Sequence, residues 1–203
     1  MSLLVSLPSL QGVPFTLVAG RRGRFLRRPS LRYACCEQIG MSDRPHRLPG
    51  FSYLGLHRYS LTFCVQKRAH VFVDARLVCE VLEQISQAAS DHQFEILAYC
   101  FMPDHLHLLV EARSSDSDLI SFANLVKQRT SFAYRQSHPE RLWQKGYFEH
   151  IVRNDESTQI VAKYVLENPV RAGLVKEPLD YPFSGSLVFS KQQLIDLWHE
   201  RMP

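Results

Sequence analysis

The chain of 203 residues lacks several features that would place it in a specialised class. No apolar run approaches the roughly 18–20 residues of a membrane span, so no contact with a membrane is expected. Its five cysteines are an odd number without CxxC spacing, which argues against a disulfide framework or a zinc knuckle. No repeat of solenoid length is present. We therefore expect one domain with free thiols in a reducing compartment, the cytoplasm.

Strong charge of one sign is also missing from most of the chain, although the formal net charge is +4. Residues 1–40 hold six arginines and one acid, Glu37, for a net charge of +5. The other 163 residues carry 18 basic and 19 acidic side chains. Because that part has no global positive field, any case for nucleic-acid binding must rest on local patches and on a site.

The first forty residues mix Leu, Ser, Gly, Pro and Arg without a sustained period of 3.6 or 2.0 residues. Such a composition does not bury a core, so we expect a disordered or wrongly assigned extension ahead of a start at Met41. A transit peptide is the alternative, because the segment bears Arg and Ser and is poor in acids. The folded domain is expected over 41–190, followed by a C-terminal helix or tail over 191–203.

Strand and helix patterns alternate along the folded part of the chain. Strands are predicted over 58–66, 94–102, 105–112 and the second half of 142–153. Helices are predicted from Asp74 to about Ser90, from Asp116 or Ser117 to about Arg135, over 155–167 and around 190–200. The third helix is expected to have its cap at Asn154 and to stop at Pro169. The order strand–helix–strand–strand–helix–strand is the split βαβ arrangement. We therefore expect an α+β, ferredoxin-like fold with a central antiparallel sheet, helices on one face and extra C-terminal helices.

Two histidines stand out in "CFMPDHLHLLVEA", residues 100–112. His105 and His107 are two apart on a predicted strand, so both imidazoles point to the same face. Unpaired imidazoles are costly to bury, whereas neutral imidazole is a common ligand of divalent metals and two on one face can bind one ion. Exposed histidines on an edge strand are the alternative, and the pair alone does not decide between the two.

A second group of polar residues lies in "VAKYVLENPVRAGLV", residues 161–175. Tyr164 and Asn168 are four apart near the end of a predicted helix, so they share a face. Tyr164 could instead be a core aromatic residue, and Asn168 a helix C-cap, since Pro169 follows and biases it away from helical dihedrals. Brought together, the two imidazoles, the phenol and the amide would form a metal-assisted nucleophile site.

Four segments, in order, resemble the REP-associated tyrosine transposases, IS200-like single-tyrosine members of the His–hydrophobic–His (HUH) endonucleases. They are "GLHRYSLTFCVQKRAHVF", "AYCFMPDHLHLLVEA", "LWQKGYFEHIVRNDES" and "YVLENPVRAGLVKEPLDYPFSGS", and together they cover about residues 53–188. The resemblance implies that the domain over 41–190 is an HUH transposase domain. It also implies that the chain cleaves and rejoins single-stranded DNA beside imperfect hairpins.

The resemblance assigns His105 and His107 as metal ligands, Asn168 as the third ligand and Tyr164 as the nucleophile. A phenol with a pKa near 10 is a poor nucleophile at neutral pH, and a divalent cation on the phosphate, Mg²⁺ or Mn²⁺, would act as a Lewis acid. Attack by Tyr164 would give a 5′-phosphotyrosine and a free 3′-hydroxyl. Hairpin or single-stranded DNA is the expected partner of a monomer or homodimer.

Residues that contact the DNA are harder to choose from sequence. Basic side chains could bind phosphates, and an aromatic side chain could stack on an unpaired base; the candidates are Lys127, Arg129, Arg153, Lys163, Arg171 and Trp143. Solvated surface charge, and core packing for Trp143, are the alternatives. Two other functions also remain open, a non-catalytic hairpin-binding regulator and a metal-dependent phosphodiesterase that uses water. A covalent protein–DNA adduct would separate the transposase from both.

Overall fold

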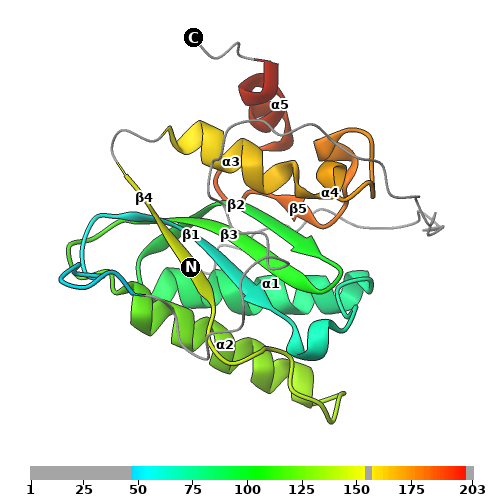
Figure 1. The fold of residues 1–203 in the computed structure, drawn as a ribbon, viewed down its shortest axis with the longest axis horizontal. Coiled ribbons are helices and arrows are strands. Elements are labelled where there is room, and N and C mark those ends of the chain that lie inside the picture. Colours follow the sequence, from blue (N-terminus) through cyan, green and yellow to red (C-terminus); the bar gives the residue numbers. More distant parts are fainter. Residues whose placement is uncertain (1–46, 154–156, 200–203) are drawn as a thin grey trace, which may run out of the picture.

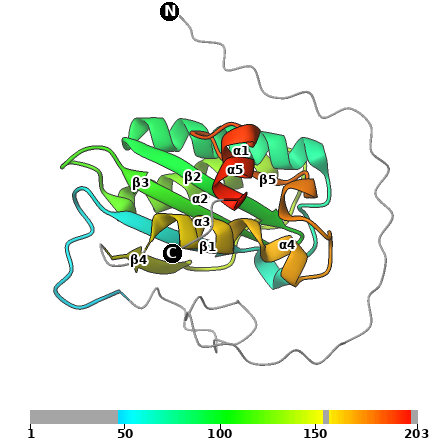
Figure 2. The same cartoon turned by 90° about the horizontal axis from the view of Figure 1, so that it is seen from above.

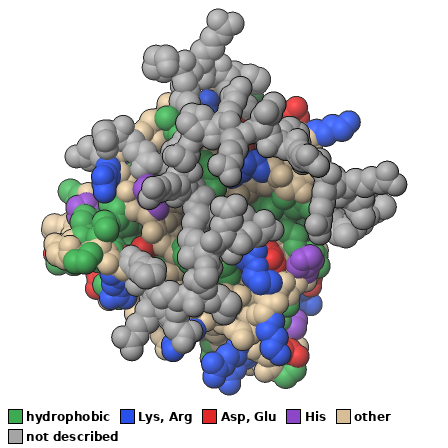
Figure 3. Space-filling model, in the orientation of Figure 1, with side chains coloured by type: hydrophobic (Ala, Val, Ile, Leu, Met, Phe, Trp, Pro, Cys, Tyr) green, Lys and Arg blue, Asp and Glu red, His purple; other side chains and the backbone are tan. Residues whose placement is uncertain are grey.

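The computed structural model describes residues 47–153 and 157–199 (Figure 1). The predicted extension over 1–40 and the predicted helix cap at Asn154 lie outside these ranges. Within them, no helix is both long and apolar enough to cross a bilayer. Where described side chains are visible in Figure 3, Lys and Arg are spread over several places among hydrophobic and acidic side chains.

The sheet has the ferredoxin-like arrangement predicted from the sequence and one further strand. Its strands are β1 (Arg58–Cys64), β2 (Phe94–Met102), β3 (His105–Ala112), β4 (Phe148–Val152) and β5 (Ser184–Gly185). They lie in the order β4-β1-β3-β2-β5, and each neighbouring pair is antiparallel. The first four have the order of the split βαβ fold, which confirms the ferredoxin-like architecture.

The short strand β5 was not expected, because the segment around it was interpreted as an irregular return. Ser184 and Gly185 pair with Cys100 and Tyr99 at the edge of β2. A Cβ atom at Gly185 would lie 3.0 Å from the Tyr99 hydroxyl, so a larger residue here would require the Tyr99 side chain to shift.

Helices cover both faces of the sheet (Figure 1). On one face lie α1 (Ala75–Asp91) and α2 (Leu119–Arg135), and on the other α3 (Thr158–Leu166), α4 (Asn168–Arg171) and α5 (Lys191–His199). The view in Figure 2 looks down on the second group, with α3 above the strands. Each face has its own hydrophobic cluster, so the central strand β3 is buried on both sides. This double burial explains its continuous apolar run.

The start of α1 agrees with the prediction, but the start of α2 does not. The Asp74 carboxylate accepts a hydrogen bond from the Arg76 amide at 2.9 Å and caps α1. The cap of α2 is Asp118, whose carboxylate accepts from the Ile120 amide at 2.8 Å, in place of the predicted Asp116 or Ser117. Ser117 is buried, and its hydroxyl donates to a carbonyl of another segment. Three consecutive residues of capping type cannot be ranked from sequence.

Pro169 begins a helix, which corrects the prediction that it ends one. Helix α3 stops at Leu166, and after one residue α4 starts at Asn168 with Pro169 in its first turn. In that position the missing N–H of proline leaves no hydrogen bond unmade. The Asn168 side chain satisfies the end of α3, because its Nδ2 donates to the carbonyls of Tyr164 at 3.1 Å and Val165 at 3.0 Å.

Candidate functional site

His105 and His107 lie on β3, the central strand of the sheet. Only 7% and 4% of their surfaces are exposed, so the interpretation as exposed histidines of an edge strand is wrong. In the strand register His107 is opposite Cys100 of β2. Cys100 belongs to the hydrophobic cluster that contains Val161 and Val165 of α3. The imidazoles therefore point to the face of the sheet that α3 covers.

The two rings are held by hydrogen bonds that aim them at each other. Their Nε2 atoms are 3.1 Å apart. Nδ1 of His105 lies 2.6 Å from the Asp104 carboxylate, and Nδ1 of His107 lies 2.9 Å from the Thr62 hydroxyl. A carboxylate only accepts, so Nδ1 of His105 carries the proton and its Nε2 offers a lone pair. If Thr62 donates to Nδ1 of His107, the Nε2–H of His107 can donate to that lone pair.

The charge states of this group follow from burial and from neighbouring charges. Burial lowers the pKa of His107 well below its usual value, and His105, Arg171 and Arg68 act in the same direction. Burial raises the pKa of Asp104, but the hydrogen bond to His105 and nearby positive charges outweigh it, so this pKa is lowered. A neutral imidazole and an ionised carboxylate are the forms that a metal ligand and its supporting residue require.

The histidine pair fits a divalent cation. Metal–nitrogen bonds of about 2.0–2.2 Å that meet near a right angle separate the two nitrogens by about 3 Å, close to the Nε2–Nε2 distance. Among the described residues, no group of three or more His, Cys, Asp or Glu side chains could hold a metal ion.

Tyr164 is half-buried on α3, and the side chain of Arg171 in α4 contacts it. The Arg171 guanidinium carbon lies 3.9 Å from the centre of the tyrosine ring, and its Nη2 donates to the Tyr164 carbonyl at 2.9 Å. Burial lowers the pKa of His107 and raises the pKa of Cys100, and the positive charge of Arg171 acts to lower both. Arg171 thus connects the tyrosine with the histidine face of the sheet.

Three of the predicted DNA contacts lie on the opposite face, in or beside α2. The Lys127 ammonium donates to the carbonyls of Gln144 at 2.7 Å and Gly146 at 2.6 Å. Arg129 pairs with an aspartate of α1 at 2.7 Å. Trp143 is buried, and its indole N–H donates to Thr130 at 2.7 Å. Lys127 and Trp143 are engaged in part-buried and buried hydrogen bonds, respectively, and Arg129 in a surface ion pair, and all three lie away from the histidine face. We therefore leave them out of the proposed DNA-binding set.

The structural role of Lys127 can be measured. We expect Lys127→Met to lower the free energy of unfolding by about 2 kcal/mol at pH 7, because two carbonyls lose a charged donor. Urea denaturation with an unchanged m-value would measure this difference. As a control, Arg129→Met removes a more exposed ion pair and should cost less than about 1 kcal/mol. Equal stability of Lys127→Met and wild type would contradict the assignment.

The same lysine should make stability depend on pH. Burial lowers the pKa of Lys127 from 10.5 to about 8 in the folded chain. Between these values the unfolded chain binds more protons than the folded chain, so stability rises with pH. Wild type should therefore gain stability relative to Lys127→Met as the pH rises through this window, and urea curves at several pH values would test this.

Sequence reasoning missed the residues that support the histidines. Thr62 and Asp104 each contact one imidazole, and Arg68 contacts Asp104 through its Nε at 2.8 Å. Asp104 stands directly before His105, which is a usable signal. Thr62 is an ordinary strand residue, and Arg68 reaches the site from a loop. Their roles become visible only in three dimensions.

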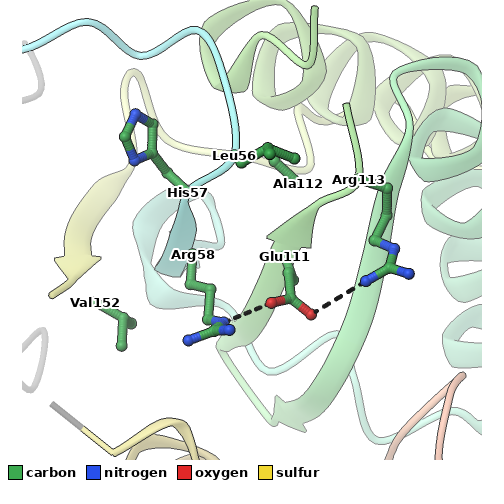
Figure 4. A pocket seen from close by; sticks show the side chains of 7 residues that line it. All are labelled: Leu56, His57, Arg58, Glu111, Ala112, Arg113 and Val152. Atoms are coloured by element: carbon green, nitrogen blue, oxygen red, sulfur yellow. Dashed lines mark hydrogen bonds and ion pairs between the residues drawn. The ribbon is translucent and has the colours of Figure 1, made fainter. Parts of the chain in front are cut away.

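A surface pocket of about 400 Å³ lies away from this site (Figure 4). It is at the far end of the same strands, where β1 begins and β3 ends, and it is lined by Leu56, His57, Arg58, Glu111, Ala112, Arg113 and Val152. The charges of Arg58 and Arg113 meet the Glu111 carboxylate at 2.6 and 3.8 Å. The histidine pair is at the other end of β3, so this pocket is not part of the candidate site.

Comparison with known proteins identifies the family of the chain. The sequence profile of the family "Transposase IS200 like" matches residues 54–168, which include both histidines, Tyr164 and Asn168. A Haemophilus influenzae protein whose name contains "REP-associated tyrosine transposase" is 29% identical over 138 residues, which cover 63% of this chain and 78% of the relative. The REP-associated tyrosine transposase of Escherichia coli K12 is 31% identical over 100 residues, covering 49% and 59%.

A solved structure supports the fold. It is that of a REP-associated tyrosine transposase bound to a REP hairpin, with a TM-score of 0.58 and 24% identity. The match covers 68% of this chain and 81% of that chain. The family profile covers more than half of the sequence, so the chain belongs to the IS200-like transposases, a family of DNA-processing enzymes.

Proposed function

We propose that this chain is a metal-dependent transesterase that cleaves and rejoins single-stranded DNA at REP-like hairpins through a 5′-phosphotyrosine. The observation that carries the proposal is the convergence of two buried imidazoles, Nε2 to Nε2 at 3.1 Å, on the sheet face covered by the tyrosine-bearing helix α3. The names of the two relatives, and the hairpin bound in the solved neighbour, support the choice of substrate.

His105, His107 and Asn168 would hold Mg²⁺ or Mn²⁺. The two imidazoles would offer Nε2, and Asn168 would offer Oδ1, because its Nδ2 is committed to two carbonyls of α3. A bound divalent cation would supply Lewis-acid activation of a phosphate oxygen. The Asp104 and Thr62 contacts would keep both rings in the ligating orientation, as supporting residues do at other metal sites.

Tyr164 would attack the phosphorus in line. A bond forms between the phenolic oxygen and phosphorus, the bond to the 3′-oxygen breaks, and the phenolic proton leaves the tyrosine while the 3′-oxygen gains one. The products are a 5′-phosphotyrosine and a free 3′-hydroxyl. Because the covalent intermediate keeps the phosphodiester energy, a second 3′-hydroxyl can reverse the step and join strands without ATP.

Of the six predicted DNA contacts, three basic residues remain in the proposal. Arg171 stacks on Tyr164, Lys163 lies beside it on α3, and Arg153 is exposed after the end of β4. Phosphate contacts from these side chains would fix the position of the strand without reading its sequence.

The experiment that tests the proposal is a search for the covalent intermediate. Labelled single-stranded DNA with a hairpin is incubated with the chain and Mn²⁺ or Mg²⁺ and is run on a denaturing gel. We expect a protein-linked band, a fragment with a free 3′-hydroxyl, and loss of both in EDTA. Binding without cleavage would favour the regulator, and cleavage without an adduct would favour the phosphodiesterase that uses water.

A further inference from the structure

Arg68 is joined to the histidine pair through a single carboxylate. Asp104 accepts from Nδ1 of His105 at 2.6 Å with Oδ1 and from Nε of Arg68 at 2.8 Å with Oδ2. Both oxygens are therefore engaged, one by the imidazole and one by the guanidinium. Because the carboxylate is fixed at both oxygens, its direction toward His105 depends on where Arg68 lies.

The loop that carries Arg68 is built around the turn that carries Asp104. It leaves β1 through a short 3₁₀ turn, Gln66–Arg68, and wraps around the β2–β3 turn. The Val65 amide donates to the Asp104 carbonyl at 2.9 Å, and the Phe72 amide donates to the Pro103 carbonyl at 3.0 Å. Backbone hydrogen bonds thus hold the two segments together on both sides of Arg68.

The backbone at Arg68 has an unusual conformation. Lys67 and Arg68 have φ values of 55° and 56°, in the left-handed region that residues other than glycine rarely adopt. Backbone strain of this kind persists only where the surroundings fix it, and it is frequent next to functional sites. Here the strained turn points the Arg68 side chain back toward Asp104, where the ion pair forms.

We propose that Arg68 is a positioning residue of the metal site, which acts through Asp104 to fix the ring orientation and tautomer of His105. The inference rests on the proposed function, because the ion would be bound by His105 and His107. Arg68 itself touches neither the ion nor the DNA in this role. In this role Arg68 keeps Nε2 of His105 directed toward Nε2 of His107, so that both atoms face the same position.

A purely structural ion pair would behave differently. Exposed ion pairs contribute little to stability on average, and the chain offers a more exposed pair for comparison in Arg76 and Glu80 on α1, whose Nε and Oε1 are 3.1 Å apart. Among the described residues, the Glu80 carboxylate contacts no imidazole. Loss of the Arg76 pair should leave metal binding unchanged, whereas loss of the Arg68 pair should weaken it.

The test measures Mn²⁺ affinity of the full chain by isothermal titration calorimetry. We expect Arg68→Gln and Asp104→Asn each to weaken Mn²⁺ binding by about 10-fold or more, as loss of a supporting residue does at other metal sites. Arg68→Lys keeps the charge and should recover most of the affinity, and Arg76→Gln should match wild type. In the metal-free chain, imidazole ¹⁵N shifts should report a His105 protonated at Nδ1 in wild type and a mixture of tautomers in Arg68→Gln.

The outcomes separate this inference from the proposed function. Wild type that binds Mn²⁺, together with Arg68→Gln that binds it as tightly as Arg76→Gln, would overturn the role of Arg68 alone. Wild type that binds no Mn²⁺ would overturn the metal site and the role of Arg68 with it. Thermal unfolding of each variant identifies any chain that fails to fold, and Asp104→Asn and Arg68→Lys then still decide the result.

Discussion

Tyr164→Phe should remove the covalent protein–DNA band completely and leave the fold unchanged. The substitution deletes one oxygen and keeps the ring, over which the Arg171 guanidinium lies at 3.9 Å. Because the ring is half-buried and its packing stays, stability should change by about 1 kcal/mol or less. Chemistry should stop, because the phenolic oxygen is the atom that forms the bond to phosphorus.

The matched control for this variant is Tyr181→Phe. Tyr181 is buried in the cluster beneath α3, and its hydroxyl donates to the Phe101 carbonyl at 2.9 Å. Its loss should lower the melting temperature more than Tyr164→Phe does, yet the adduct should form at a normal rate. Both variants are compared on a denaturing gel with the same labelled hairpin DNA. An adduct that persists in Tyr164→Phe would move the nucleophile to another residue.

The sequence predicted the fold well where local patterns are strong. Alternating residues in β1, the apolar runs of β2 and β3 and the Pro103-Asp104 break between them are short-range signals of strands and a tight turn. Asp74 marked the start of α1 for the same reason. The order of these elements then left the split βαβ arrangement as the simplest topology, and the structure has it.

The sequence could not predict which face of the sheet a polar residue would reach. Lys127 and Trp143 were plausible DNA contacts by residue type, but α2 and the segment after it pack on the face opposite to the histidines. Which helix covers which face of the sheet depends on tertiary packing, and no local sequence pattern indicates it. Trp143 is therefore buried in the core, and Lys127 donates hydrogen bonds to backbone carbonyls.

Only some residues of the candidate site can be picked out from the sequence. The histidine pair is visible in the sequence, because a strand puts residues two apart on one face. Tyr164 and Asn168 were predicted on one helix, but the structure has Tyr164 in α3 and Asn168 at the start of α4. Arg68 is not visible in the sequence, because it reaches Asp104 through a left-handed backbone conformation that ordinary side chains seldom adopt. Three-dimensional contacts of this kind fix the tautomer of His105 and the orientation of both rings.

His107→Ala should abolish both Mn²⁺ binding and cleavage. His107 offers one of the two convergent Nε2 atoms, and burial keeps its ring neutral, the form that binds metal. Without it, His105 alone cannot hold the ion at the same affinity. His105→Ala should have the same effect, because each imidazole is half of the pair.

These variants should also have a measurable cost in stability, since the rings are nearly fully buried. His107→Ala leaves the Thr62 hydroxyl without its 2.9 Å partner and opens a small cavity, so the free energy of unfolding should fall by about 2 kcal/mol. The fold should survive this loss.

His138→Ala is the control, because His138 stacks on Tyr134 at the end of α2, on the other face of the sheet, and should keep metal binding and cleavage. Calorimetric Mn²⁺ titration and the adduct gel measure both properties, and full activity of the His105→Ala/His107→Ala double variant would refute the metal site.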